Sequence, residues 1–169
     1  MLVDHIVVSR KSIKSRDVYA VIESNISVVN YLLEEGAEPD ELSPDALGSY
    51  YVDYYLAEVL NGGISQFVFN CCGEHQVLDH ITHALPLLGA TGHAELFSEV
   101  RARWDAMDAE EKQAFFDGGL FGSADPFEEF SDRFYELNGS EDLIELNSAF
   151  IRKDRKSTRL NSSHSTESR

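Results

Sequence analysis

The chain has 169 residues, 43% of them hydrophobic, and a formal net charge of −16 from 14 basic and 30 acidic side chains. This length and composition predict a folded protein with one domain rather than a disordered chain. No apolar run reaches the roughly 18–20 residues that cross a bilayer, which argues against a membrane protein. The N-terminus places its apolar part before its basic part, the reverse of a secretory signal, so we expect a cytoplasmic protein.

The acidic residues are concentrated in the middle of the chain. Residues 17–151 contain 27 acidic and four basic residues, a net charge of −23. Residues 1–16 carry four basic residues against one acid, and residues 152–169 carry six against two. We therefore expect a basic N-terminal segment, an acidic domain and a basic, serine-rich tail. The tail has too few apolar residues to order itself, and is either an extension foreign to the protein or a natural flexible tail.

Apolar side chains recur at three- and four-residue steps along most of the acidic domain, which predicts helices. The first expected helix spans about 17–35, with Asp17 as its N-cap and Gly36 just after its end. Ser43 is expected to cap a second helix, which continues to about Leu60.

Six further helices are expected at about 64–71, 76–88, 91–104, 108–117, 126–138 and 140–151. Asp108 and Glu111 have the spacing of a reciprocal capping box. Ser140 is expected to cap the last helix. Only the sequence HIVV, at residues 5–8, has the composition of a strand. The sequence thus predicts an all-α fold, a single compact domain of about seven or eight helices.

The double glycine in Asn61-Gly62-Gly63 follows the apolar stripe of the second expected helix. A phosphate-binding glycine loop leads into a helix and has a Lys or Arg nearby, but no Lys or Arg lies between Arg16 and Arg101. A hairpin would need alternating strands on both sides. The glycines are therefore predicted to end one helix and turn into the next.

Polar residues surround this predicted corner. Gln66 and Asn70 are four residues apart and share a helix face. Buried amides need hydrogen-bond partners, and we expect the exposed backbone groups of the corner to supply them. The alternative is a catalytic site built on Glu58, but no nucleophile–base pair accompanies this carboxylate, so no catalytic residue is predicted.

The stretch YYVDYYLAEVLNGGISQFVFNCCG, followed by ALPLLGATGHAELF, resembles the bacterial DNA-mimic protein family. The motif that carries the resemblance consists of Glu58, Asn61, Gly62, Gly63, Gln66, Phe67 and Asn70. The resemblance implies an all-helical domain, often dimeric, whose acidic surface imitates the phosphates of duplex DNA. In such proteins this surface occupies a DNA-binding protein.

The charge of this chain agrees with that implication. A net charge of −23 equals the phosphates of roughly a dozen base pairs. Many of the acids stand three or four residues apart on expected helices, about 5–6 Å between Cβ atoms. The acids predicted to contact a partner are Glu95, Glu99, Asp105, Asp108, Glu110, Glu111, Asp117, Glu128, Glu129, Asp132 and Glu136.

Acidity of this kind can also arise without mimicry. Runs of charge are often only solvated helix faces, and high net charge is also a device of salt-adapted proteins. We expect a non-enzymatic DNA mimic that blocks a DNA-binding protein, such as a transcription factor, and that does not itself bind nucleic acid. The alternative is an immunity-type or other inhibitor of a basic partner, and an enzyme or metal protein is a third.

The residues closest to a metal-binding pattern are Cys71, Cys72, Glu74, His75, His80 and His83. Adjacent cysteines are not the usual zinc spacing, and no second pair follows. The cysteines also follow an apolar run, which predicts buried, inert thiols. We therefore expect no metal and no cofactor. Two tyrosines, Tyr50 and Tyr54, are candidates for a homodimer interface, where Tyr is favoured.

Overall fold

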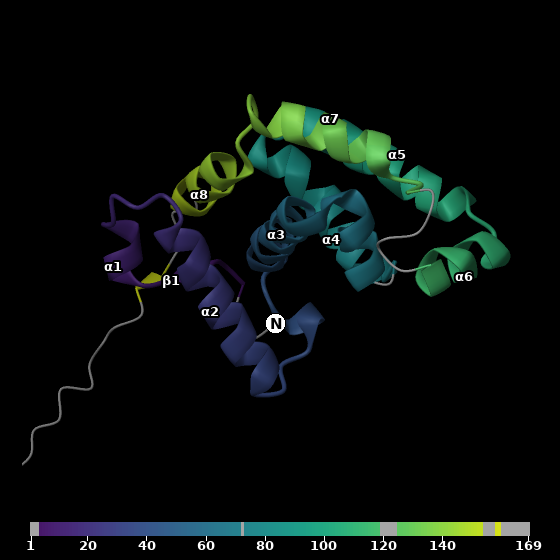
Figure 1. Ribbon diagram of the computed structural model, residues 1–169. Helices are drawn as coiled ribbons and strands as arrows, with labels where there is room; N and C mark the ends of the chain where they lie inside the picture. The colour runs from purple at the N-terminus through teal and green to yellow at the C-terminus, as the bar shows by residue number, and fades with distance from the viewer. Residues whose placement is uncertain (1–3, 72, 119–124, 154–157, 160–169) are drawn as a thin grey trace, which may run out of the picture.

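Figure 1 shows the computed structural model of the protein, which describes residues 4–71, 73–118, 125–153 and 158–159. The helices in these residues are α1 (Arg10–Ile13), α2 (Ala20–Glu34), α3 (Pro44–Cys71), α4 (His75–Leu88), α5 (Thr91–Ala106), α6 (Ala109–Gly118), α7 (Glu128–Asn138) and α8 (Leu143–Lys153). The prediction of an all-α domain with seven or eight helices is confirmed. None of the described helices combines the length and apolar character needed to span a membrane.

Short elements flank these helices. A 3₁₀ helix, Pro39–Glu41, precedes α3. The two-residue strand β1 (Val7–Val8), within the predicted strand, pairs in parallel with β2 (Thr158–Arg159). The rest of the predicted tail after α8, residues 154–157 and 160–169, lies outside the described residues.

Helix α3 lies at the centre and packs against α2, α4, α7 and α8. The larger hydrophobic cluster surrounds α3 from Val52 onward and contains five fully buried rings, those of Tyr55, Phe67, Phe97, Phe127 and Phe134. The Tyr55 ring has its centroid 4.9–5.4 Å from those of Phe67, Phe97 and Phe134. A smaller cluster joins β1, α2, the start of α3 and the end of α8.

Several predicted helix ends are corrected by the structure. Helix α2 begins at Ala20 rather than Asp17, because the Asp17 carboxylate accepts the backbone N–H of Tyr19 in the turn before the helix. Ser140 does not cap the last helix, since its hydroxyl donates to the Leu137 carbonyl. The Asp142 carboxylate is the cap, and accepts the N–H groups of the first turn of α8 at 2.8 and 3.2 Å.

Helix α8 also continues past its predicted end at Ile151, to Lys153. The guanidinium of Arg152 donates to the Ile13 carbonyl of α1 at 2.6 Å and to the Ser148 hydroxyl at 3.2 Å. These bonds fix the last turn of α8 against the N-terminal segment. Ile6 and Val8 of that segment are buried in the smaller cluster.

The expected capping residues of two other helices are confirmed. The Ser43 hydroxyl accepts the N–H of Ala46 at 3.4 Å, next to Pro44 at the start of α3. The Asp108 carboxylate accepts the N–H of Glu111 at 2.8 Å, and the Glu111 carboxylate accepts the N–H of Asp108 at 3.0 Å. Capping boxes of this kind can therefore be identified from spacing alone.

Candidate functional site

The double glycine bends α3 into two helical halves, as predicted. Gly62 has φ −162° and ψ 30°, and Gly63 has φ 76° and ψ −178°, both outside helical geometry. Glycine alone occupies the second of these regions readily. A Cβ on Gly63 would also lie 2.7 Å from the hydroxyl oxygen of Ser131 on α7. The corner therefore needs glycine both for its backbone and for the approach of α7.

A carboxylate spans the corner from one helical half to the other. Glu58 accepts hydrogen bonds from the amide of Gln66 at 2.9 Å and from the amide of Asn70 at 2.6 Å, both at the same oxygen. Both amides thus donate to a carboxylate, a partner that was not among the expected backbone groups. Three motif side chains instead hold one another, which gives Glu58 a structural role.

The backbone groups released by the bend are held by α7. The Ser131 hydroxyl oxygen accepts the N–H of Ile64 at 2.9 Å, and the Tyr135 hydroxyl donates to the Val59 carbonyl at 2.8 Å. Ser131 and Tyr135 lie one turn apart, so both reach α3 from the same side of α7. Sequence reasoning missed both residues. These two hydrogen bonds fix α7 on α3. We use the corner as the name for the double glycine, the contacts of Glu58 and these two bonds together.

Helix α7 also carries part of the predicted acidic surface, the eleven acids from Glu95 to Glu136 named above. All eleven side chains are exposed, on α5, on α7, or on α6 and its N-cap. Helices α5 and α7 lie side by side. On α7, Glu128, Asp132 and Glu136 recur every four residues, while Phe127 and Phe134 are fully buried on the opposite side. The apolar positions thus direct the carboxylates outward.

Basic residues interrupt this surface. Arg133 of α7 holds Glu99 of α5 through two bonds of 2.7 Å. The hydrogen bonds from Arg133 lower the pKa of Glu99, and those to Glu99 raise the pKa of Arg133. Arg101 bonds Asp79 of α4 at 2.6 Å and lies 3.9 Å from Asp105. The negative charges of Glu99, Asp79 and Asp105 are therefore partly compensated.

Three further acids of the surface have local partners. Asp108 and Glu111 form the capping box, and Asp117 accepts the amide of Gln113 at 2.8 Å. Within the described part of the chain, the remaining six form no hydrogen bond or ion pair: Glu95, Glu110, Glu128, Glu129, Asp132 and Glu136. Four of these six are on α7. The acids without a described hydrogen bond or ion pair are therefore concentrated on α7, with Glu95 on α5 and Glu110 on α6, and among them Glu129 still acts electrostatically on Arg133.

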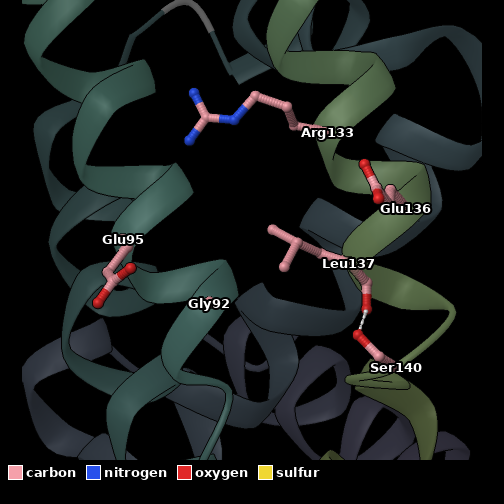
Figure 2. A pocket seen from close by; sticks show the side chains of 6 residues that line it. All are labelled: Gly92, Glu95, Arg133, Glu136, Leu137 and Ser140. Atoms are coloured by element: carbon pink, nitrogen blue, oxygen red, sulfur yellow. Dashed lines mark hydrogen bonds between the residues drawn. The ribbon is translucent and has the colours of Figure 1, made fainter.

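A groove of about 320 Å³ lies between α5 and α7. Figure 2 shows Glu95 on one wall and Glu136 on the other, with the Arg133 side chain extending from α7 toward α5. Gly92 and Leu137 also line the groove, and provide a small, apolar part of its wall. The groove thus combines two carboxylates and an apolar surface with the guanidinium of Arg133, which is paired with Glu99.

A second acidic region was not among the predicted contacts. Glu34, Glu35, Glu38 and Asp40 are exposed where α2 ends and the 3₁₀ helix begins. The signal that could have found them is the absence of Lys and Arg between residues 16 and 101. This region has no neighbouring basic residue in sequence, in contrast to the surface on α5–α7.

The described members of the metal-like cluster do not come together as a group of ligands. No group of three or more His, Cys, Asp or Glu side chains in the described residues could hold a metal ion. His80 instead stacks on Tyr51, with ring centroids 5.2 Å apart, and burial lowers its pKa. Cys71 is buried, whereas Cys72 lies outside the described residues.

The two tyrosines proposed for a homodimer interface are partly covered within the chain. Tyr50 makes an edge contact with Tyr51 and packs on the smaller cluster. Tyr54 makes an edge contact with Phe67 of the larger cluster. Both rings are half-buried, and their role in a dimer stays a prediction.

The fold and this surface define a class: an all-helical protein with an acidic face built on α5–α7. The model of the DMP19-like protein family matches residues 40–154, and the chain belongs to this family. The match includes the corner and all of α3–α8. Comparison with curated proteins and with solved structures gave no match.

Proposed function

We propose that this protein is a non-enzymatic DNA mimic, which binds a basic DNA-binding protein through the acidic surface and blocks its access to DNA. The partner would be a protein such as a transcription factor, in the cytoplasm. The observation that carries the proposal is the group of six exposed carboxylates without a hydrogen bond or ion pair in the described structure, on α7 and the neighbouring α5 and α6.

Their arrangement supports the proposal better than their number does. Carboxylates four residues apart on a helix lie about 6 Å apart, and Glu128, Asp132 and Glu136 repeat this step twice. Such like charges repel one another and mildly destabilise α7. A basic partner would relieve the repulsion and would release the salt ions held at its own DNA contacts.

The groove adds a contact that a flat charged surface lacks. Lys and Arg side chains have an apolar stem and a charged end. Leu137 offers apolar contact for the stem, and Glu95 and Glu136 offer carboxylates for the end from opposite walls. We expect one basic side chain of the partner to enter here.

The test is capture of basic proteins by the full chain at low and at moderate salt, with duplex DNA as competitor. The proposal expects a retained DNA-binding protein that duplex DNA displaces and that added salt weakens, because exposed charges are screened within about 10 Å at 0.1 M salt. Retention of no basic protein would overturn it. Retention of a basic toxin that DNA never displaces would favour the immunity-type inhibitor instead.

A matched pair of variants separates the surface from the total charge. The first combines Glu128→Gln, Asp132→Asn and Glu136→Gln. The control combines Glu34→Gln, Glu35→Gln and Asp40→Asn, and removes the same number and types of acid from the second acidic region. We expect the first to weaken partner binding about tenfold or more and the control to change it less than about threefold. Equal losses would show that net charge, rather than this surface, attracts the partner.

The assembly state is a separate part of the proposal. A homodimer is expected from the family resemblance, and light scattering on the full chain measures it directly. A monomer at concentrations well above the partner affinity would remove the dimer from the proposal without affecting the mimicry.

A further inference from the structure

A second hollow, of about 280 Å³, lies where α1 meets the first half of α2. Its lining contains five serines, one lysine and one glutamate. Figure 1 shows α1 and α6 at opposite ends of the molecule, so this hollow is remote from α6 and the end of the acidic surface there. Neither the corner nor the acidic surface uses any of its residues.

Three of the five serine hydroxyls in this hollow have hydrogens left to donate, whereas Ser12 and Ser27 donate theirs to the Ser9 and Glu23 carbonyls. The Ser24 oxygen accepts the N–H of Ser9 at 2.9 Å, the Ser9 oxygen accepts the N–H of Ser12 at 3.1 Å, and the Ser15 oxygen accepts the N–H of Asp17 at 3.1 Å. A hydroxyl has one donor hydrogen besides its acceptor lone pairs. Among the described contacts, none of these three hydroxyls donates its hydrogen.

The charge around the hollow favours an anionic ligand, which could accept the free hydroxyl hydrogens. Lys11 lines it, and the exposed Arg10, Lys14 and Arg16 belong to the same segment. The first residue of α2, Ala20, also lines the hollow, so the positive end of the α2 dipole borders it. The lining itself contains one acid, the exposed Glu23, against one cation, Lys11, so the positive excess comes from the three other basic residues of the segment.

We propose that this hollow binds a phosphate group, held by the ammonium of Lys11 and the hydroxyls of Ser9, Ser15 and Ser24. Lysine and serine side chains are common donors to phosphate oxygens. A phosphate offers three strong acceptor oxygens, which suits four donors lining one hollow better than a single carboxylate would. The proposal is independent of the DNA mimicry, because it uses a different surface and the opposite sign of charge.

The source of the phosphate is either a small soluble molecule or a lipid headgroup, and two probes distinguish them. The full chain is titrated with inorganic phosphate at constant ionic strength, followed by NMR shifts of the backbone amides of residues 9–27. The same chain is mixed with vesicles that contain phosphatidic acid, with phosphatidylcholine vesicles as the control. Binding to phosphate indicates a soluble ligand, and binding to the acidic vesicles alone indicates a headgroup. Binding to neither probe would overturn the proposal.

Two substitutions of exposed residues give responses of opposite sign. Lys11→Gln removes the cation, and is expected to weaken the binding of whichever probe binds about tenfold. Glu23→Gln removes the like charge next to the bound anion, and is expected to tighten it about threefold. Lys153→Gln, an exposed cation of α8 outside the lining, is the control and should change the dissociation constant less than about twofold.

This design also excludes the competing ligands. A sugar would use Glu23 as an acceptor for its hydroxyls, so Glu23→Gln would weaken its binding. A dissociation constant unchanged by Lys11→Gln, or a weaker one in Glu23→Gln, therefore overturns the phosphate assignment. Both side chains are exposed, and neither forms a hydrogen bond with the described part of the chain. The variants are therefore expected to fold as the parent chain does, which melting curves check.

Discussion

The corner and the acidic surface share helix α7, yet they treat their polar groups in opposite ways. On the inner side, Ser131 and Tyr135 satisfy the backbone of α3, and the Glu58 carboxylate of α3 is held by two amides. On the outer side, Glu128, Asp132 and Glu136 are exposed and form no hydrogen bond or ion pair in the described residues.

The difference separates what builds the fold from what can meet a partner. A buried polar group that loses its partner costs about 1–3 kcal/mol, whereas an exposed carboxylate is solvated and costs little to replace. The corner should therefore control stability and the acidic surface should control binding. Substitutions on the two sides of one helix can test this division.

The largest expected loss comes from Gly63→Ala. The substitution forces a Cβ into a backbone region suited to glycine and to 2.7 Å from the Ser131 oxygen. We expect the free energy of unfolding to fall by about 2–4 kcal/mol, measured by urea denaturation. Gly89→Ala is the milder control. Gly89 lies in the left-handed helical region, with φ 82° and ψ 13°, and nothing lies within 4 Å of its added Cβ, so the loss should be about 1 kcal/mol. Equal losses would show that neither the backbone region of Gly63 nor the approach of α7 adds to this cost.

The next largest effect is expected at the two α7 side chains of the corner. Ser131→Ala leaves the N–H of Ile64 without a partner in a buried position and should cost about 1–3 kcal/mol. Tyr135→Phe should cost less, about 1 kcal/mol, because Tyr135 is 46% exposed and water can reach the Val59 carbonyl. Tyr31→Phe, at a ring that is 60% exposed, is the control and should be neutral. A larger loss in Tyr135→Phe than in Ser131→Ala would contradict this order.

The sequence predicts one side of this division well. The apolar period and the double glycine indicate where α3 bends, and the motif names the three side chains that meet across the bend. The sequence does not predict the two α7 side chains that hold the bend. Ser131 and Tyr135 are 67 and 76 residues from the α3 backbone groups that they bond. A serine and a tyrosine among acids carry no signal of such distant contacts.

For the acidic surface, the sequence predicts which acids are exposed but not which of them form ion pairs. Exposure of the eleven acids follows from helix periodicity, since the apolar positions determine which side faces the core. Which acids keep an uncompensated charge does not follow. Arg133 and Glu99 are 34 residues apart, and only the packing of α7 on α5 brings them within 2.7 Å.

A fall in pH should lower the free energy of unfolding through the buried His93, whereas protonation of the exposed carboxylates would raise it. His93 of α5 is fully buried, bonds the Glu141 carbonyl through Nε2 and lies against the Phe134 ring. Burial lowers its pKa, although the contacts with Glu141 oppose this shift. Its folded pKa is below that of the unfolded chain, about 6.5, so the unfolded state binds the proton first. The stability contribution of His93 is therefore present above about pH 6.5 and is lost as the pH falls toward the folded pKa.

Urea denaturation across about pH 7.5 to 5 measures this effect. We expect His93→Gln to flatten the fall in stability with falling pH, whatever its effect at neutral pH, and the exposed His83→Gln to leave the slope as in the parent chain. If relief of carboxylate repulsion dominated this range instead, stability would rise on acidification in all three proteins.

The smallest effect on stability is expected from the acidic surface itself. The triple variant Glu128→Gln, Asp132→Asn and Glu136→Gln removes two like-charge steps on α7, each worth about 0.2–0.5 kcal/mol of repulsion in an isolated helix. The variant should therefore unfold at an equal or slightly higher urea concentration than the parent chain at low salt. At about 0.5 M salt, screening shortens the range of these charges and the two proteins should become indistinguishable. A loss of more than about 1 kcal/mol would mean that these carboxylates hold the fold together, which would place them with the corner rather than opposite it.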